Sequence, residues 1–368
     1  MRKLTLLLLI LAFQAQSQWY YCSNPWLANY KYRKVITIKQ TNISSALTSF
    51  PVYVKCDNTI MGALVDQTNF YDIRFTDTTN AVLPYEKDYS TSSGGNFWVN
   101  TSLSATASHP TRIYCYYKNS TSQTDGSNQN GTWNSAFKGV WHLPNGTTLT
   151  SNDATSNGNN VTVSSPAPTA TTGKVDGCAT FDGSSTYLNG GTSTSLQPPN
   201  HITLSAWAYL TSNVTARTIS SSWSEGGAPF ARNGFYLGIS DVNTSYVKSA
   251  IGYGSSGATY VLVESTGALS LNTWYYLSMV YNGSNVILYI NGSSNNSGTA
   301  ISPPVYTASN RFTMGAFYSG SAYGQYFPGN LDEIRISNTD RSADWIKFEY
   351  YNMNDSDQDL TWSAVQTR

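Results

Sequence analysis

Residues 273–292 read TWYYLSMVYNGSNVILYING and predict two antiparallel strands separated by a polar turn. Apolar side chains alternate along 277–281 and again along 286–290, and such alternation places them on one face of a strand. The dipeptide Asn291-Gly292 then supplies a strong signal for a two-residue hairpin. Two turns in succession predict a β-meander.

Three further stretches carry strand patterns: GCATFDGSSTY at 177–187, TLSAWAYL at 203–210 and GNLDEIRIS at 329–337. In this order, and with 273–292 between them, they resemble the laminin-G-like, concanavalin A-like lectin/glucanase jelly-roll family. The resemblance implies an antiparallel β-sandwich over 136–352. It also implies a role in recognition outside the cell rather than in metabolism.

A separate β-sandwich-like domain is predicted at 18–119, where short strand patterns alternate with polar turn clusters. The strings FPVYVKCD, YDIRFTDTTNAVLPYE and IYCYYKN resemble an uncharacterised domain found beside laminin-G-like modules in secreted microbial proteins. That resemblance covers 26–119 and implies architecture but no chemistry. Both domains together give an all-β fold class. The one charge-rich patch is interpreted as exposed ion pairs or turn caps and contains Asp72, Arg74, Asp77 and Glu86.

Residues 1–17 fit a secretory signal peptide. A basic pair precedes a short apolar run at 4–13, and Ala-Gln-Ser at 15–17 supplies small residues for cleavage. The mature chain is expected to start at Gln18 and to be secreted. The apolar run is too short to span a bilayer, which takes about 20 residues, so no membrane insertion is expected.

Two polar segments are expected to lie outside the domains. Residues 120–135 read as a linker without periodicity, and 353–368 read as a solvated C-terminal tail. The tail contains Asp355, Asp357 and Asp359 in a D-x-D-x-D spacing, but it lacks the glycine and distal glutamate of a calcium loop. A short helix that closes the sandwich is predicted just before it, at 342–351.

The composition is polar but almost uncharged. Of 368 residues 40% are hydrophobic, enough for sizeable cores, and only 11% are charged. Lys and Arg number 21 against 21 Asp and Glu, and no basic stripe with stacking aromatics is present. Nucleic acid is therefore not an expected partner.

Export changes how the four cysteines are interpreted, because an oxidising compartment favours disulfides. Cys56 ends one strand alternation and Cys115 continues another. Both side chains are expected to face inward, so a bridge between them is the leading pairing. Cys22 and Cys178 would then remain to form a second bridge. Four buried thiols are the alternative.

Asp332 is the leading candidate metal ligand. Counting by twos places it on the face of Ile334 and Ile336, where a carboxylate needs backbone hydrogen bonds, an ion pair or a metal. The family resemblance implies a structural calcium, with Asp332 as side-chain ligand and Asp182 and Gly183 as weaker candidates. A strand-end cap or an ion pair remains the alternative.

Catalysis is not expected. Polysaccharide hydrolases of this fold need two carboxylates that flank the scissile bond. Among the glutamates only Glu86 has an acid two residues away, Asp88, and that pair lies outside the predicted jelly roll. The three histidines are isolated, without a nucleophile or metal spacing nearby.

A binding site would need aromatic platforms and neutral hydrogen-bonding groups on loops. The chain has 10 Trp and 27 Tyr, and the loops at 223–233 and 317–327 combine both types. The candidate ligand-binding residues are Trp223, Tyr318, Tyr323 and Tyr326, although each of them could instead pack on a neighbouring sheet.

Three functions are therefore considered, in descending order. The first is non-catalytic recognition or adhesion, with a glycan or cell-surface glycoprotein as partner. The second is a structural subunit of an extracellular assembly, with self-association through tyrosine-rich surfaces. The third is hydrolysis of a polysaccharide.

Overall fold

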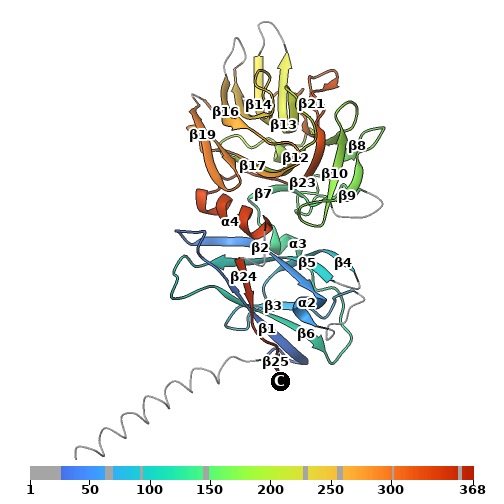
Figure 1. Ribbon diagram of the computed structural model, residues 1–368, viewed down its shortest axis with the longest axis vertical. Coiled ribbons are helices and arrows are strands. Elements are labelled where there is room, and N and C mark those ends of the chain that lie inside the picture. Colours follow the sequence, from blue (N-terminus) through green and yellow to red (C-terminus); the bar gives the residue numbers. More distant parts are fainter. Residues whose placement is uncertain are drawn as a thin grey trace, which may run out of the picture.

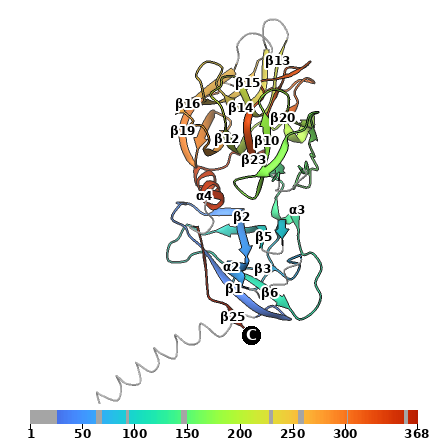
Figure 2. The same cartoon turned by 45° about the vertical axis from the view of Figure 1, so that its right-hand side comes forward.

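The computed structural model describes residues 26–62, 69–91, 94–143, 149–226, 231–254, 260–300, 302–354 and 359–368. Two β units are stacked along the long axis of the molecule, and helix α4 (Ala343–Asn354) lies where they meet (Figures 1 and 2). The fold is all-β and antiparallel throughout, as the strand patterns predict. In the described part of the chain no helix combines the length and apolar character needed to cross a membrane.

The first unit contains two small antiparallel sheets. The three-stranded sheet has the order β2 (Leu47–Asp57), β5 (Gly94–Leu103) and β4 (Tyr85–Thr91). The five-stranded sheet has the order β24 (Leu360–Trp362), β1 (Tyr30–Ile38), β6 (Arg112–Asn119) and β3 (Arg74–Thr76), with β25 (Gln366–Thr367) also paired to β1. Apolar side chains between the sheets form its core, including Ile36, Val52, Phe75, Phe97 and Ile113.

The C-terminal residues belong to this first unit, so the prediction of a solvated tail at 353–368 is wrong. Strand β24 adds to the edge of β1, with Ile38 opposite Leu360 and Ile36 opposite Trp362. Asp359 is only 2% exposed, whereas Asp355 and Asp357 lie outside the described residues. The first unit is therefore built from both ends of the chain, which Figure 1 shows as blue and red strands side by side.

The linker predicted at 120–135 is also part of the packed structure. Its end forms the short helix α3 (Gln129–Thr132). The N-cap of this helix is Asn128, whose side chain accepts a hydrogen bond from the Gly131 backbone N–H. Trp133 follows and is 1% exposed, with its ring 5.6 Å from that of Trp98. A buried tryptophan anchors this segment to the first unit.

The second unit is a sandwich of a seven-stranded and an eight-stranded sheet. The seven-stranded sheet has the order β16 (Tyr260–Ala268), β15 (Tyr246–Tyr253), β14 (Ala231–Ile239), β13 (Arg217–Gly226), β20 (Phe312–Met314), β11 (Leu188–Gly191) and β8 (Thr162–Val163). The eight-stranded sheet has the order β19 (Ser293–Thr299), β18 (Asn285–Ile290), β17 (Trp274–Tyr281), β12 (Ile202–Leu210), β23 (Pro328–Ser337), β10 (Gly177–Asp182) and β9 (Thr169–Thr172), with β7 (Phe137–Trp141) also on β23.

The predicted meander is confirmed in this sandwich. Strand β17 pairs with β18, and β18 pairs with β19. Asn291 and Gly292 connect β18 to β19 with φ angles of 51° and 77°, the left-handed conformation that a two-residue hairpin of this type requires. The alternating side chains Leu277, Met279 and Leu288 all lie in the core between the two sheets.

The outer face of the eight-stranded sheet packs on helix α4 (Ala343–Asn354) and on the first unit. Trp207 and Tyr276 on this face share one buried cluster with Phe50 of β2 and Trp345 of α4. The rings of Phe50 and Trp345 lie 4.6 Å apart. The helix predicted at 342–351 is therefore confirmed, and it joins the two units through a common apolar core.

Polar contacts reinforce this junction at the start of α4. The Asp344 carboxylate accepts hydrogen bonds from the backbone N–H groups of Ser44 (3.0 Å) and Ser45 (2.8 Å) and from both hydroxyls. Burial alone raises the pKa of Asp344, but these hydrogen bonds outweigh it and hold the pKa below its usual value. The carboxylate therefore stabilises the fold mainly in its charged form.

An Asp344→Ala variant is expected to have a free energy of unfolding about 1 kcal/mol lower than that of the original protein at pH 7, because four donors lose their charged acceptor at a partly exposed position. Since the folded pKa is lowered, this stabilisation is present above the ordinary pKa of an aspartate and is lost as the pH falls through the folded value. Urea titrations at pH 7 and at successively lower pH should therefore give a difference at pH 7 that shrinks as the pH falls below the ordinary pKa of an aspartate. Asp340→Ala, at a nearby exposed aspartate, is the control; an equal loss there would contradict the expectation.

Candidate functional site

A β-bulge in β23 sets the positions of its acidic side chains. Ser205 of β12 is opposite Arg335, but Trp207 is opposite Asp332, so two residues of β23 face the single residue between Ser205 and Trp207. Glu333 has a φ of 49° at this point, which is the left-handed region that a bulge uses.

The bulge overturns the prediction that Asp332 shares a face with Ile334 and Ile336. Leu331, Ile334 and Ile336 all lie in the core of the sandwich, so Asp332 and Glu333 both lie on the opposite face. Counting by twos fails because the extra residue shifts the alternation by one. Both carboxylates consequently face the first unit and α4.

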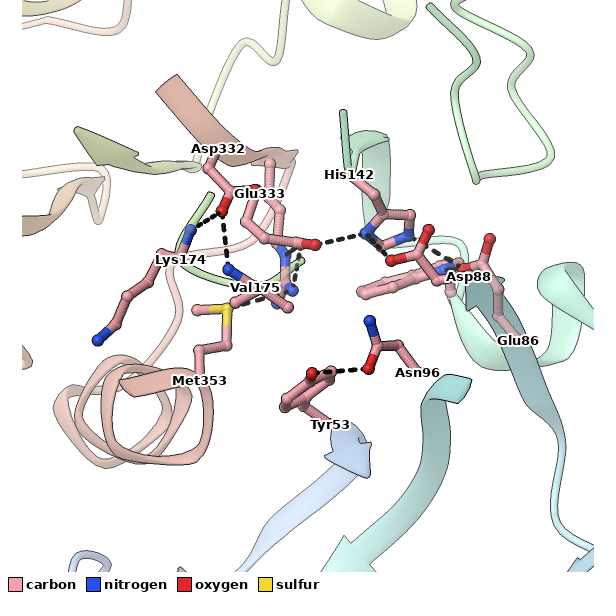
Figure 3. Close-up of polar contacts among 12 residues, drawn as sticks. Tyr53, Glu86, Asp88, Asn96, His142, Lys174, Val175, Asp332, Glu333 and Met353 are labelled. Atoms are coloured by element: carbon pink, nitrogen blue, oxygen red, sulfur yellow. Dashed lines mark hydrogen bonds and ion pairs between the residues drawn. The ribbon is translucent and has the colours of Figure 1, made fainter. Parts of the chain in front are cut away.

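Glu333 and Arg335 on that face meet charged side chains of the first unit and of α4, and we call this group the interface cluster (Figure 3). It is built from side chains of both units and of α4, all of them buried, and contains Glu86, Asp88, His142, Glu333, Arg335 and Glu349. His142, which follows β7, lies at its centre between Glu333 on one side and the two acids of β4 on the other.

His142 donates to carboxylates through both ring nitrogens. Its Nδ1 lies 2.8 Å from Glu333 Oε1, and its Nε2 lies 3.2 Å from Glu86 Oε2. Burial lowers the pKa of His142, but Asp88, Glu333 and Glu86 together raise it well above its ordinary value. Because carboxylates only accept, the ring is held as an imidazolium.

Arg335 is the second cation of the interface cluster. Its Nη2 lies 2.7 Å from Glu333 Oε2, and its Nη1 lies 2.7 Å from Glu349 Oε1. The guanidinium also lies over the Trp98 ring, 4.3 Å from its centroid, an arrangement that favours a cation. Arg335 thus pairs with two buried acids, of which Glu333 is also paired with His142.

Glu86 is fully engaged with donors from the first unit and its connection. Its Oε1 accepts from Gln129 Nε2 at 2.6 Å, and its Oε2 accepts from both Trp133 Nε1 and His142 Nε2. The prediction that Glu86 belongs to an exposed patch of ion pairs or turn caps is therefore wrong, because its side chain is buried. Asp77 does fit the prediction, since it caps a turn by accepting from the Thr79 and Ala81 backbones. Asp72 and Arg74 do not: Asp72 is buried and accepts from the Lys118 backbone, and Arg74 donates to backbone carbonyl oxygens.

Asp88 differs from the other acids of the interface cluster. Its side chain is 4% exposed and its Oδ2 lies 4.0 Å from His142 Nδ1, yet this oxygen accepts no hydrogen bond. Burial raises the pKa of Asp88 to about 7, with Glu333 and Glu86 adding to the rise and His142 opposing it. A cavity of about 510 Å³ connects this region to solvent and is lined by Glu86, Asp88, Gln129, His142 and Asp153.

The structure does not bring the predicted calcium ligands together. Asp332 Oδ2 accepts from the Lys174 and Val175 backbones at 2.7 and 2.9 Å, which is one of the compensations that a buried carboxylate needs. Burial, followed by Glu333, raises the pKa of Asp332 well above its usual value.

Asp182 lies elsewhere on the neighbouring strand and is paired with Pro328, four residues before Asp332 along β23. Four residues of strand span about 13 Å. Asp182 accepts from the backbones of Ser184, Ser185 and Thr186 and so caps the turn that contains Gly183. Calcium at Asp332 stays a prediction without support from these two neighbours.

The cysteines are buried free thiols in the described residues. Cys56 on β2 and Cys115 on β6 face each other across the first unit, as predicted, but they are not bonded. Burial raises the pKa of the Cys115 thiol well above its usual value, and Cys56 adds to the rise. The structure therefore does not contain the predicted bridge. Cys178 donates to the Thr172 carbonyl oxygen at 3.3 Å, whereas Cys22 lies outside the described residues.

The aromatic candidates gather on the outer face of the seven-stranded sheet. Trp223 is 5% exposed and packs with Tyr236 and Phe317, so its ring forms the floor of a narrow pocket. Two ion pairs border that pocket, Glu225 with Arg232 at 3.4 Å and Asp241 with Lys248 at 2.5 Å. Trp223 is therefore buried as the alternative predicted, but mainly against its own seven-stranded sheet rather than a neighbouring one.

The three tyrosine candidates lie together beside this pocket. Tyr318 and Tyr323 belong to the two-stranded sheet of β21 (Phe317–Tyr318) and β22 (Tyr323–Gly324), and their rings are 4.9 Å apart. Tyr187, which the sequence did not single out, stacks on Tyr323 at 3.7 Å and lies 6.4 Å from Tyr326. All four rings are partly exposed. We call Trp223, Tyr187, Tyr318, Tyr323 and Tyr326 the aromatic surface.

A comparison with models of known protein families supports the jelly-roll prediction for the second unit. Residues 182–347 match a family model described as the Concanavalin A-like lectin/glucanases superfamily. The C-terminal sandwich is a concanavalin A-like jelly roll. The match stops short of the first unit, whose resemblance to an uncharacterised domain stays a prediction. No curated protein matches the chain.

Several solved structures resemble the jelly roll at low identity. Domain 4 of AbnA, a GH43 extracellular arabinanase from Geobacillus stearothermophilus, in complex with arabinotriose, is 18% identical over 58% of this chain and 97% of that chain, with a TM-score of 0.43. The binding domain of Paraclostridial Mosquitocidal Protein 1 is 11% identical over 58% and 52%, with a TM-score of 0.45. The CBM40 of Ruminococcus gnavus IT-sialidase, bound to alpha2,3 sialyllactose, is 12% identical over 43% and 86%, with a TM-score of 0.37. At this similarity the ligands of those proteins are not transferred to this jelly roll.

Proposed function

We propose that this chain is a secreted, non-catalytic recognition protein that binds glycan, or a cell-surface glycoprotein, through the aromatic surface of its jelly roll. The observation that carries the proposal is the group of four partly exposed tyrosine rings beside the pocket over Trp223. Export rests on the signal-like residues 1–17 alone.

The chemistry of this region suits a sugar. The apolar faces of pyranose rings stack on aromatic side chains, and their hydroxyls pair with amides, carboxylates and guanidinium groups. Gln325 and Glu225 line the pocket, and Arg311 lies over the Tyr318 ring, 4.5 Å from its centroid. Stacking platforms and hydrogen-bonding groups therefore lie side by side on one surface.

The carboxylates of the interface cluster do not favour a hydrolase. Glycoside hydrolysis needs one acid to protonate the leaving group and one to act as base or nucleophile. Both oxygens of Glu86 are already held by three donors, and both oxygens of Glu333 are held by His142 and Arg335. Within the described interface cluster, Asp88 Oδ2 is the one buried carboxylate oxygen without a hydrogen-bond donor, so a second free acid of the catalytic pair is missing there.

A Tyr318→Ala variant is expected to weaken glycan binding about three- to tenfold, since one aromatic contact contributes about 0.5–1.5 kcal/mol. A glycan array would first identify a ligand, and calorimetry with that ligand would measure the change. Tyr318→Phe keeps the ring and should bind nearly as well as the original protein. Tyr351→Ala, at a partly exposed tyrosine on α4, is the matched control and should not change affinity.

An array without any bound glycan would overturn the proposal. Equal losses in Tyr318→Ala and Tyr351→Ala would show that the aromatic surface is not the binding site. Light scattering that finds large particles of the mature protein would instead favour the structural subunit of an assembly.

A further inference from the structure

We propose that Asp88, His142 and Glu333 bind a divalent transition-metal cation at the junction of the two units, with Zn²⁺ as the best-fitting ion. The three side chains come from β4, the residue after β7 and the bulge of β23. One ligand atom from each lies within 4.8 Å of the others. This inference is independent of the glycan proposal.

The separations fit a common ion after small adjustments. Two ligands that each lie about 2.1 Å from Zn²⁺ are roughly 3.0–3.5 Å apart. His142 Nδ1 lies 2.8 Å from Glu333 Oε1 and 4.0 Å from Asp88 Oδ2. Because all three ligand atoms lie within 4.8 Å of one another, movements of up to about one ångström would bring them to bonding distance.

Asp88 supplies the independent observation that a ligand belongs here. Its side chain is only 4% exposed to solvent, and its Oδ2 has no hydrogen-bond donor. A buried carboxylate oxygen without a partner is costly. In Figure 3 the Asp88 carboxyl points toward the His142 ring, which is where the cation would lie.

The groups behind the three ligands already have the arrangement that metal sites use. Metal-bound histidines typically donate their other N–H to a carboxylate, which fixes the ring orientation. Glu86 accepts from His142 Nε2 in this way and is itself held by Gln129. Arg335 holds Oε2 of Glu333 at 2.7 Å, so that Oε1 is the oxygen directed toward the site.

Charge balance also favours a divalent ion. Four buried acids, Glu86, Asp88, Glu333 and Glu349, face Arg335 and the single positive charge of His142. A divalent cation that replaces the Nδ1 proton of His142 increases the local positive charge by one and approaches neutrality.

The donor set indicates which kind of ion would bind. One imidazole nitrogen with two carboxylate oxygens suits Zn²⁺, whereas Ca²⁺ takes six to eight oxygen ligands. The cavity of about 510 Å³ that includes Asp88 and His142 in its lining gives the ion an entry path. It also leaves room for a water molecule as a fourth ligand.

The experiment uses the full mature chain, stripped with chelator and dialysed. Calorimetry with ZnCl₂ should show one site per chain, and Zn²⁺ should raise the melting temperature. Asp88→Asn should weaken Zn²⁺ binding at least about tenfold, while Asp88→Glu, which keeps a carboxylate, should retain much of it. Asp125→Asn, at an exposed aspartate of the same unit, is the matched control and should bind like the original protein.

Circular dichroism of the two Asp88 variants separates loss of a ligand from loss of the fold. Asp88→Asn removes no hydrogen bond at Oδ2, so it should fold. The absence of saturable Zn²⁺ binding to the original protein would overturn the proposal. Equal Zn²⁺ affinity of Asp88→Asn and the original protein would overturn it as well.

Discussion

Replacement of Arg335 by alanine is expected to remove about 3–5 kcal/mol from the free energy of unfolding. The guanidinium lies 2.7 Å from carboxylate oxygens of both Glu333 and Glu349, and all three side chains are buried. The variant would leave the Glu349 carboxylate out of water without its counter-ion and would leave Glu333 with His142 alone. It would also remove a planar group that packs on Trp98. Urea unfolding at pH 7, followed by tryptophan fluorescence, would measure the loss.

Two further variants make this test specific for the buried charges. Arg112→Ala replaces an exposed arginine and should change the free energy by no more than about 0.5 kcal/mol. Glu349→Gln in the Arg335→Ala background removes the carboxylate left without a counter-ion and should recover part of the loss. A small effect of Arg335→Ala, similar to that of Arg112→Ala, would mean that the ion pairs do not stabilise the junction.

The strands of the jelly roll could be predicted because their signals are local. Alternation along 277–281 and 286–290 fixes which side chains enter the core, and Asn291-Gly292 fixes the hairpin. The helix after β23 was similarly visible from its capping residue, since Ser342 Oγ accepts from the Trp345 backbone at 3.2 Å. Such features depend on residues within a few positions of each other.

The interface cluster could not be predicted, because its members are far apart in the sequence. His142 is 56 residues from Glu86 and 191 residues from Glu333. The Glu86–Asp88 pair was recognised, but its partners come from the other unit. The bulge at Glu333 hid the remaining signal, because strict alternation sends Asp332 to the wrong face.

The aromatic surface was predictable in part. Residue type and loop position selected Tyr318, Tyr323 and Tyr326, and the structure places their rings in one group. Tyr187 follows a different strand and stacks on Tyr323 only because the fold brings 182–187 beside the rim loop. Trp223 was selected on the same grounds as the tyrosines, but strand β13 turns its ring onto the sheet.

The C-terminal strands were missed because they are too short to show a period, and their importance can be tested at Leu360. This side chain is 3% exposed in the core of the first unit, opposite Ile38 of β1. Leu360→Ala is expected to reduce the free energy of unfolding by about 2–4 kcal/mol, since a buried leucine leaves a cavity when it is truncated. Urea unfolding and amide hydrogen exchange along β1 would measure the effect, and exchange should accelerate at Lys39, whose N–H donates to the Asp359 carbonyl oxygen at 2.8 Å.

Val365→Ala is the matched control within the same segment. Val365 is 38% exposed and should contribute no more than about 0.5 kcal/mol. A solvated tail predicts equal, negligible effects for the two variants, whereas a paired tail predicts a large effect at Leu360 alone. Unchanged unfolding and unchanged exchange in Leu360→Ala would therefore restore the tail that the sequence suggested. The expected contrast instead makes β24 and β25 part of the first unit, which is then assembled from segments that lie on both sides of the jelly roll in the sequence.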